Sequence, residues 1–429
     1  MSSTPHSLPS PPSGPPASPP LSSSATFASS YRLTRRRFLA GASVLGAAVA
    51  VGACSTDDQS ARSAAGADSA SRGVGDGGGT LVIVTLAGGN DALNTVAPVG
   101  DARYQDLRAA LALDPSTTHD LGDGLGLHPS LTRTKALWDD DRLAIVHGVG
   151  FDGLDRSHFH CMDVWHAAST EDLSTGWIGR WLDLAGSDPL DAVAVGRMLP
   201  LLARGASRSA ASVPLGPFEP PGAPALQELV TGMADGGERP PLGALVAASS
   251  ADLYAVADTV GPVVAGTAEV EATAGDGLAA SLGTVAALID AGLPTRVYAV
   301  ELGGFDTHAN QAPVHEALLA ELDGALGEFC DHVAGRDVTV VVYSEFGRRV
   351  APNGSAGTDH GAGGTVLLAG NVRGGHHGDP PDLGRLVDGD LRTTLDFRAV
   401  YGGLLEGVLA VPAADVLGRG APTPLDLVT

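Results

Sequence analysis

The chain has 429 residues, 44% of them hydrophobic and 17% charged, which is enough apolar material for one or two folded domains and excludes disorder throughout. Its formal net charge is −23, from 26 Lys and Arg against 49 Asp and Glu. This charge argues against a nucleic-acid partner and against electrostatic adhesion to anionic lipid. The three cysteines are too few for a disulfide scaffold.

The N-terminal part is expected to be an export signal. Residues 1–30 are rich in Ser and Pro, carry no charged side chain and cannot supply a core. The twin arginines Arg35 and Arg36 precede a Phe-Leu pair and an uncharged run over residues 40–53. This layout is typical of a twin-arginine export signal, and the run is short for a membrane span.

A second processing feature ends this signal. Small residues lead to Cys54, which resembles the lipidated first residue of a mature lipoprotein; the alternative is ordinary cleavage near Ala53. Lipidation at Cys54 would anchor the protein in a membrane. Residues 55–80, rich in Ser, Ala, Gly and Asp, are expected to form a flexible tether. We therefore expect a location outside the cytoplasmic membrane: cell surface, periplasmic or extracellular, either anchored or freely secreted.

The rest of the chain, residues 81–429, is predicted to be one α/β domain. Nearly continuous apolar runs, typical of strands buried on both faces of a parallel sheet, occur at residues 81–86, 143–146, 297–300, 338–343 and 366–369. Helical periodicity is found at residues 159–168, 278–291, 311–333 and 398–409. Residues 204–277 are less regular and predict a helical or loop-rich insertion. The alternation of strands and helices predicts a mostly parallel central sheet.

Polar, Gly-rich clusters lie next to several predicted strands, where open α/β sheets bind ligands. Following the chain, they contain Asn90, Asp91, Asn94 and Thr95, then Asp306 and His308, then Glu345 and Arg348, then Asp359 and His360, and finally His376 and His377. Carboxylates and imidazoles that converge at strand ends could bind a divalent metal. Zinc would favour the histidines, and calcium, magnesium or manganese the oxygens. The alternative for each cluster is a hydrogen-bonded turn.

Several other residues have two interpretations each. Ser157 is expected to be the N-cap of a helix, or else to line a pocket together with His158. Cys161 and Cys330 are expected to be buried core residues, with a disulfide between them as the alternative. Arg348 could pair with Glu345 or hold an anion such as phosphate or sulfate.

The combination of motifs resembles the bacterial domain-of-unknown-function 1501 family over about residues 80–410. The motifs that carry the resemblance are the segments 86–95, 127–129, 156–158, 176–180, 304–308, 344–348, 358–361 and 396–398. That family is grouped with the alkaline phosphatase and sulfatase superfamily. The resemblance therefore implies a three-layer α/β/α sandwich with a metal site at the carboxyl edge of its sheet.

The resemblance also implies roles for particular residues. It places Asp91, Asp306, His308 and His360 as metal ligands, Glu345 as a ligand or base, Arg348 as an anion clamp and Thr95 as the nucleophile. Phe346 stands where the superfamily carries a histidine. In another alignment, Asp359 and His360 form the superfamily's Asp-His pair, and His376 or His377 is the last ligand.

These features lead to three hypotheses. The first is an exported, metal-dependent hydrolase of phosphate or sulfate esters. The second is a non-catalytic surface protein of the same fold that binds a partner protein outside the membrane, since members of the family are often encoded beside another uncharacterised family. A carbohydrate-binding or sugar-modifying protein is the third.

Overall fold

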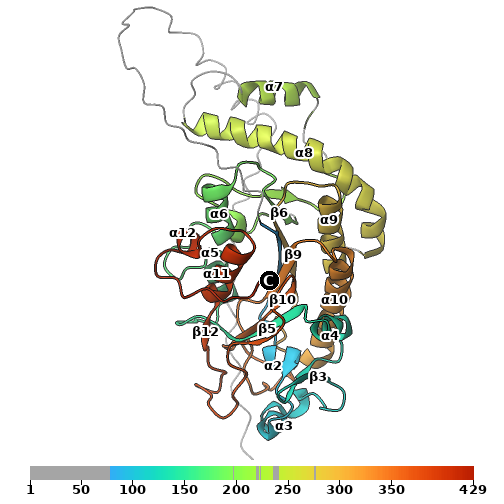
Figure 1. Ribbon diagram of the computed structural model, residues 1–429, viewed down its shortest axis with the longest axis vertical. Coiled ribbons are helices and arrows are strands. Elements are labelled where there is room, and N and C mark those ends of the chain that lie inside the picture. The colour runs from blue at the N-terminus through green and yellow to red at the C-terminus, as the bar shows by residue number, and fades with distance from the viewer. Residues whose placement is uncertain (1–77, 197, 219–221, 223, 235–240, 275–276) are drawn as a thin grey trace, which may run out of the picture. The chain divides into compact units, whose positions relative to one another are not determined.

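The computed structural model in Figure 1 describes residues 78–429, except for 197, 219–221, 223, 235–240 and 275–276. The predicted export signal with Arg35 and Arg36, the lipidation site Cys54 and the tether up to residue 77 lie outside the described residues. Among the helices that are described, none has the length and apolar character needed to cross a membrane.

A nine-stranded sheet forms the centre of the described part. Its strand order is β11-β5-β10-β9-β1-β8-β6-β7, and β12 also pairs with β5. The strands are β1 (Thr80–Leu86), β5 (Leu143–Gly150), β6 (Ala192–Val195), β7 (Ala211–Val213), β8 (Val297–Leu302), β9 (Val338–Tyr343), β10 (Gly364–Gly370), β11 (Gly375–His377) and β12 (Leu395–Asp396). The neighbours pair in parallel, except that β10 runs antiparallel to both β5 and β9.

Helices cover both faces of this sheet (Figure 1). On β1, Val82 and Val84 pack into one buried cluster with residues of α9 and α10, whereas Leu81 and Ile83 pack into another with residues of α5 and α11. This alternation along one strand, with both faces buried, requires a helical layer on each side. The predicted α/β fold class with a mostly parallel sheet between helices is confirmed.

The remaining elements connect and extend this core. The helices are α2 (Ala92–Thr95), α3 (Ala102–Arg108), α4 (Thr132–Asp139), α5 (His158–Ala167), α6 (Trp177–Ala185), α7 (Pro224–Ala234), α8 (Pro241–Ala274), α9 (Leu278–Asp290), α10 (Gln311–His332), α11 (Phe397–Gly407) and α12 (Ala413–Leu417). A small antiparallel sheet joins β2 (Val96–Ala97), β4 (Leu125–Leu127) and β3 (His119–Gly122). Within residues 204–277, where an insertion was expected, the structure has β7, α7 and the 34-residue α8.

The direction of β10 decides which polar loops meet. The apolar run at residues 366–369 predicts a strand but carries no information about its direction. Because β10 is antiparallel to its neighbours, the loop before it lies at the carboxyl ends of β1, β8 and β9. The loop after it emerges at the opposite edge of the sheet.

Candidate metal centre

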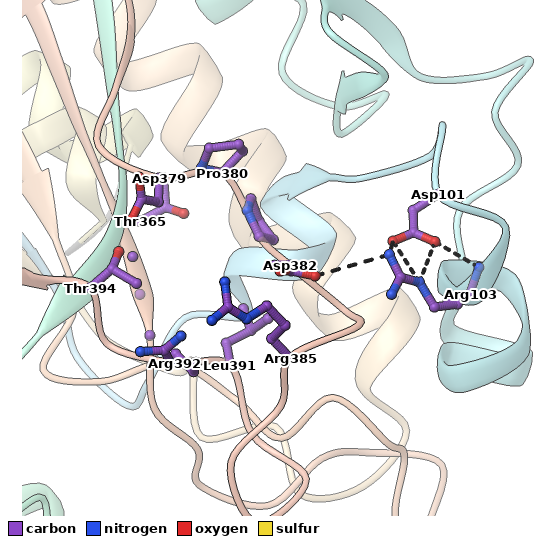
Figure 2. A pocket seen from close by; sticks show the side chains of 14 residues that line it. Asp101, Arg103, Thr365, Asp379, Pro380, Asp382, Arg385, Leu391, Arg392 and Thr394 are labelled. Carbon is purple, nitrogen blue, oxygen red and sulfur yellow. Dashed lines mark hydrogen bonds and ion pairs between the residues drawn. The ribbon is translucent and has the colours of Figure 1, made fainter.

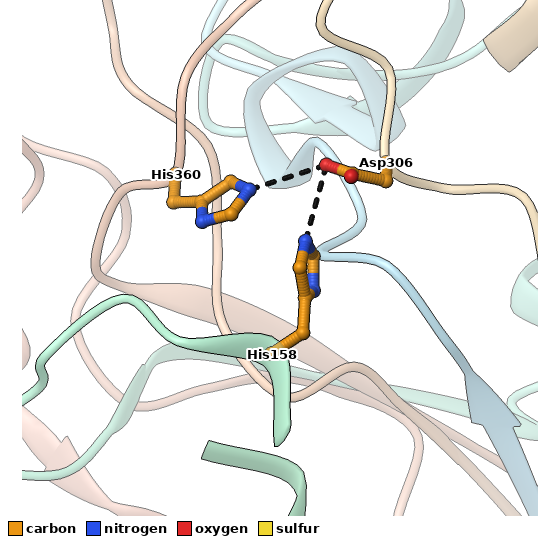
Figure 3. A group of neighbouring side chains, drawn as sticks. All are labelled: His158, Asp306 and His360. Carbon is orange, nitrogen blue, oxygen red and sulfur yellow. Dashed lines mark hydrogen bonds and ion pairs between the residues drawn. The ribbon is translucent and has the colours of Figure 1, made fainter. Parts of the chain in front are cut away.

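Two histidines and an aspartate from three distant segments converge at the carboxyl edge of the sheet. His158 is the first residue of α5 after β5, Asp306 follows β8, and His360 precedes the antiparallel β10. One ligand atom from each of the three lies within 4.8 Å of the other two. Figure 3 shows the two imidazole rings turned toward the Asp306 carboxylate.

The contacts in this group centre on a single oxygen. Asp306 Oδ1 lies 3.1 Å from His158 Nε2 and 3.2 Å from His360 Nε2. His308 Nε2 is a third imidazole nitrogen near it, at 3.0 Å. His308 Nε2 is also only 2.8 Å from His360 Nε2. We call His158, Asp306, His308 and His360 the histidine cluster.

In each of the three imidazole rings, the second nitrogen, Nδ1, lies close to an oxygen atom outside the histidine cluster. His158 Nδ1 lies 2.7 Å from Glu345 Oε1, His360 Nδ1 lies 2.6 Å from the Arg156 carbonyl oxygen, and His308 Nδ1 lies 3.3 Å from Asp359 Oδ1. A carbonyl oxygen only accepts, so His360 must carry its proton on Nδ1 when it is neutral. The two carboxylates favour the same tautomer in the other rings, which leaves the Nε2 lone pairs facing the cluster.

This donor set fits a divalent cation. Lone pairs that face one another and an ionised carboxylate repel unless a positive charge lies among them, and His158 Nε2 is buried without a hydrogen bond among the described residues. Metal–ligand bonds of about 2.0–2.1 Å in tetrahedral geometry place neighbouring ligand atoms about 3.3 Å apart, and the ligand atoms of His158, Asp306 and His360 lie within 4.8 Å of one another. Two imidazoles and a carboxylate, with the His308 imidazole beside them, favour zinc over calcium or magnesium.

Asp306 is held in its ionised form. Burial alone would raise its pKa, but the hydrogen bond and the charge of Arg348 outweigh burial and lower the pKa of Asp306 to about 2. Burial has the opposite effect on His360, whose pKa is lowered, which favours the neutral, ligating imidazole. Both groups are therefore in the protonation state that binds a metal at neutral pH.

Arg348 organises the site from within the protein. Its fully buried guanidinium donates to the carbonyl oxygens of Gly88, Gly89, Thr358 and Phe305 and to Asp306 Oδ1. Each of its three nitrogens is thereby engaged. Arg348 therefore ties the loop after β1 to the loop after β8, and its fully buried side chain is not exposed to the anion that was expected to bind it.

Glu345 supports His158. Its carboxylate is 1% exposed and accepts from the backbone N–H groups of Gly88 and Gly89 at 2.9 and 3.1 Å, and from the Ser344 hydroxyl at 2.9 Å. Gly88 has a φ of +123°, a conformation that favours glycine and lets both N–H groups face the carboxylate. The carboxylate thus acts on the cluster through the His158 ring.

A cavity of about 320 Å³ opens beside the cluster. His158, Asp306 and Glu345 form part of its wall, together with Glu301 of β8 and Phe159 of α5. Phe159 is 87% exposed, so it offers an apolar rim. Burial and the charge of Glu345 raise the pKa of Glu301. The cavity therefore brings the candidate metal ligands together with a carboxyl group whose pKa is raised.

The expected residues after β1 serve a buried polar network. Asp91 pairs with Arg108 and accepts from the Gln311 amide, and both charged side chains are buried. Burial opposes its ionisation, but the charge of Arg108 helps to lower the pKa of Asp91 below its ordinary value. The structure thus brings Asp306, His308 and His360 together and leaves the Asp91 carboxylate paired with Arg108, outside the histidine cluster.

The expected nucleophile belongs to the same network. The Thr95 hydroxyl is buried and donates to the Asp91 carbonyl oxygen at 2.9 Å. Asn90 donates to Thr95 at 3.0 Å and accepts from His315 at 2.8 Å, while Asn94 bridges Tyr104 and the Leu111 carbonyl. These contacts make Thr95 a structural residue with no hydrogen bond to the histidine cluster among the described residues.

The other expected site residues are spread over two regions. Asp359 contacts His308 and Asn353. Ser157 is the N-cap of α5, where its side chain makes no capping hydrogen bond. His376 comes after β10 and therefore lies toward the opposite edge of the sheet, where its Nδ1 is 2.9 Å from His147 Nε2. His377 contacts the Arg373 carbonyl. Thus His360, and neither His376 nor His377, joins the cluster.

The two described cysteines are free and buried, which agrees with the expected core role and argues against a disulfide between them. Cys161 belongs to the buried cluster around α5 and Cys330 to the cluster around α10, on opposite faces of the sheet.

Sequence reasoning missed several residues of the site. The sequence does contain an indication of Glu301, because a charged residue within the apolar run of β8 is unusual for a buried strand. Arg108 and Gln311, which engage Asp91, carry no local signal because their partners are distant in sequence.

The fold and the cluster define the chain as an α/β protein with a candidate metal centre at the carboxyl edge of its sheet. A protein-family model described as "Protein of unknown function (DUF1501)" matches residues 270–399. The expected resemblance is therefore confirmed over this segment, which contains Asp306, His308, Glu345 and His360 but not His158.

Comparisons with curated proteins and with solved structures do not identify a relative of established function. No curated protein matches the chain. A match among solved structures is the crystal structure of the C-terminal periplasmic domain of EcEptC from Escherichia coli, in complex with Zn. It covers 69% of this chain and 74% of that chain, with 8% sequence identity and a TM-score of 0.35. These comparisons do not assign an activity to the chain.

Proposed function

We propose that the protein is a metal-dependent hydrolase of the domain-of-unknown-function 1501 family, with an alkaline phosphatase-like fold, acting on phosphate or sulfate esters. The observation that carries the proposal is the convergence of three imidazole Nε2 atoms on Asp306 Oδ1 at 3.0–3.2 Å. The substrate class follows from the family resemblance. It does not depend on Arg348, whose nitrogens all bond to the protein.

The chain's own residues have distinct tasks in this proposal. A bound divalent cation supplies Lewis-acid polarisation of the ester and lowers the pKa of water in contact with it. The histidine cluster holds the cation, while Glu345 and the Arg156 carbonyl oxygen fix two of the rings. Glu301, with its raised pKa, transfers the proton between water and the leaving oxygen.

Water is the nucleophile in this proposal, because Thr95 is buried and bonded elsewhere. Phe159 packs against an apolar portion of the ester at the cavity rim. We also propose that the protein works outside the cytoplasmic membrane, supported by the twin-arginine pattern at Arg35 and Arg36 and by the lipoprotein-like Cys54.

Metal analysis and an ester assay test the proposal together. Purified full-length protein is expected to retain one divalent ion per chain and to hydrolyse para-nitrophenyl phosphate or para-nitrophenyl sulfate. Asp306→Asn and His360→Gln are expected to lose both the ion and the activity. His377→Gln is the matched control, because this half-buried histidine bonds outside the cluster, and it should retain both.

Different outcomes separate the hypotheses. Equal metal content in the wild type and Asp306→Asn would overturn the metal centre. Metal retention with no turnover of either ester would overturn the hydrolase and favour the non-catalytic alternative, in which the protein binds a partner protein outside the membrane.

A further inference from the structure

We propose that a second pocket, separate from the metal centre, binds a small anionic sugar. This pocket has a volume of about 470 Å³ and is walled mainly by the segment between β11 and β12, with contributions from β5, β10 and the start of α3 (Figure 2). Its size is within the range of small-molecule sites. It shares no lining residue with the cavity beside the histidine cluster.

Two exposed arginines in this pocket have no polar partner among the described residues. Arg385 and Arg392 both line it, and Figure 2 shows both side chains reaching into it. In the part of the chain that the structure describes, neither guanidinium makes a hydrogen bond or an ion pair. Arg103 differs, because it bonds to Asp101 through two nitrogens at 2.7 and 2.9 Å.

The distribution of charge within the pocket favours an anion beside Arg385 and Arg392. Three arginines and three aspartates line the pocket, so the lining has no formal net charge. Asp101 and Asp382 both lie beside Arg103, at 2.7 and 4.0 Å. Arg385 and Arg392 therefore have no carboxylate in ion-pair contact among the described residues. Paired guanidinium forks bind planar carboxylate or tetrahedral phosphate oxygens through several N–H donors.

The protein fixes the segment that carries these arginines. Leu383 and Leu391 are buried in a small apolar cluster with Tyr104. Asp390, next to Leu391, is buried and pairs with Arg156 at 2.5 Å. These anchors hold the backbone on either side of Arg385 and directly before Arg392, so little backbone entropy is lost on ligand binding.

The pocket also offers groups suited to hydroxyls. Asp379 and Thr365 lie together in Figure 2, and Thr394 lies between them and Arg392. A carboxylate and two hydroxyls accept from and donate to sugar hydroxyl groups. A ligand with both an anionic group and hydroxyls matches this lining. The shared chemistry is that of a sugar acid or a sugar phosphate.

Isothermal titration calorimetry on the full chain tests this proposal with glucuronate, glucose 6-phosphate, glucose and inorganic phosphate. We expect at least one of the two sugar anions to bind at millimolar or lower concentration, and glucose to bind more weakly. Whichever of these two sugar anions binds more tightly shows whether the pocket prefers a carboxylate or a phosphate group. Arg385→Gln and Arg392→Gln should each weaken sugar-anion binding about tenfold or more, because each removes charge-assisted hydrogen bonds.

Three further variants sharpen the test. Arg419→Gln removes an exposed arginine far along the chain from the pocket segment and should not change binding. Thr365→Val removes a hydroxyl without changing the charge of the pocket, and it should weaken the sugar anions and leave inorganic phosphate unaffected. Asp306→Asn, at the metal centre, should leave sugar-anion binding unchanged, so this proposal and the proposed hydrolase can fail independently.

The proposal is overturned by any of three results. They are the absence of binding by both sugar anions at millimolar concentration, unchanged binding in both arginine variants, and inorganic phosphate binding as tightly as the sugar anions.

Discussion

The substitution Glu345→Gln isolates the support that the protein gives to His158. It keeps the shape of the side chain but replaces one carboxylate oxygen with an amide group that only donates. Oε1 faces His158 Nδ1 at 2.7 Å and the Gly88 N–H at 2.9 Å, and Oε2 faces the N–H groups of Gly88 and Gly89 at 3.2 and 3.1 Å. In either orientation the new amide meets at least one N–H donor, so a buried donor loses its partner.

The expected magnitudes follow from these contacts. One unsatisfied buried donor costs about 1–3 kcal/mol of unfolding free energy. Loss of the acceptor that orients a ligating histidine lowers metal affinity about 10- to 100-fold, equivalent to about 1.4–2.7 kcal/mol. Zinc affinity measured by competition with a chelator, together with urea unfolding of the metal-free protein, gives both quantities.

A control in the same cavity makes this test specific. Glu301→Gln removes a carboxylate near the cluster that makes no hydrogen bond to a cluster histidine among the described residues. It should change zinc affinity by less than about threefold, a difference below 1 kcal/mol. If Glu345→Gln bound zinc as tightly as Glu301→Gln, the assignment of Glu345 as the residue that orients His158 would be refuted.

Two other predictions concern stability, and a third concerns zinc binding. Arg108→Met leaves the buried Asp91 carboxylate without its ion-pair partner and should lower the free energy of unfolding, measured in urea, by about 3–5 kcal/mol. The double variant Arg108→Met/Asp91→Asn should recover part of this stability. The absence of any recovery would contradict the pairing. Burial lowers the pKa of His166 to about 4 from an ordinary 6.5, so the unfolded chain binds its proton first as the pH falls. This site should therefore remove about 3 kcal/mol of stability between those two values. His166→Gln should lose less stability over that range, and an equal loss would argue against a neutral buried ring. Gly88→Ala should lower zinc binding, because φ is +123° and a Cβ there would collide with the Asp306 backbone nitrogen; wild-type zinc binding would show that the loop tolerates a side chain.

The amino-acid sequence by itself determined the fold class and most of the polar loops. The apolar runs of β1, β5, β8, β9 and β10 were visible because strands buried on both faces need nearly continuous apolar residues. Asp306, His308 and His360 could be chosen because carboxylates and imidazoles recur beside several strand ends, and these are the side chains that bind divalent metals. These are local signals, carried by neighbouring residues.

Only the tertiary structure decided which of these loops meet. The reversal of β10 brings His360 to the carboxyl edge and sends His376 to the other, and a run of apolar residues has no direction in its composition. Asp91 and Arg348 looked like a ligand and an anion clamp because an isolated charge reveals nothing about its partner. Their partners come from distant segments, so the buried pairing of Asp91 with Arg108 and the bonds of Arg348 to backbone carbonyls exist only once the chain is folded.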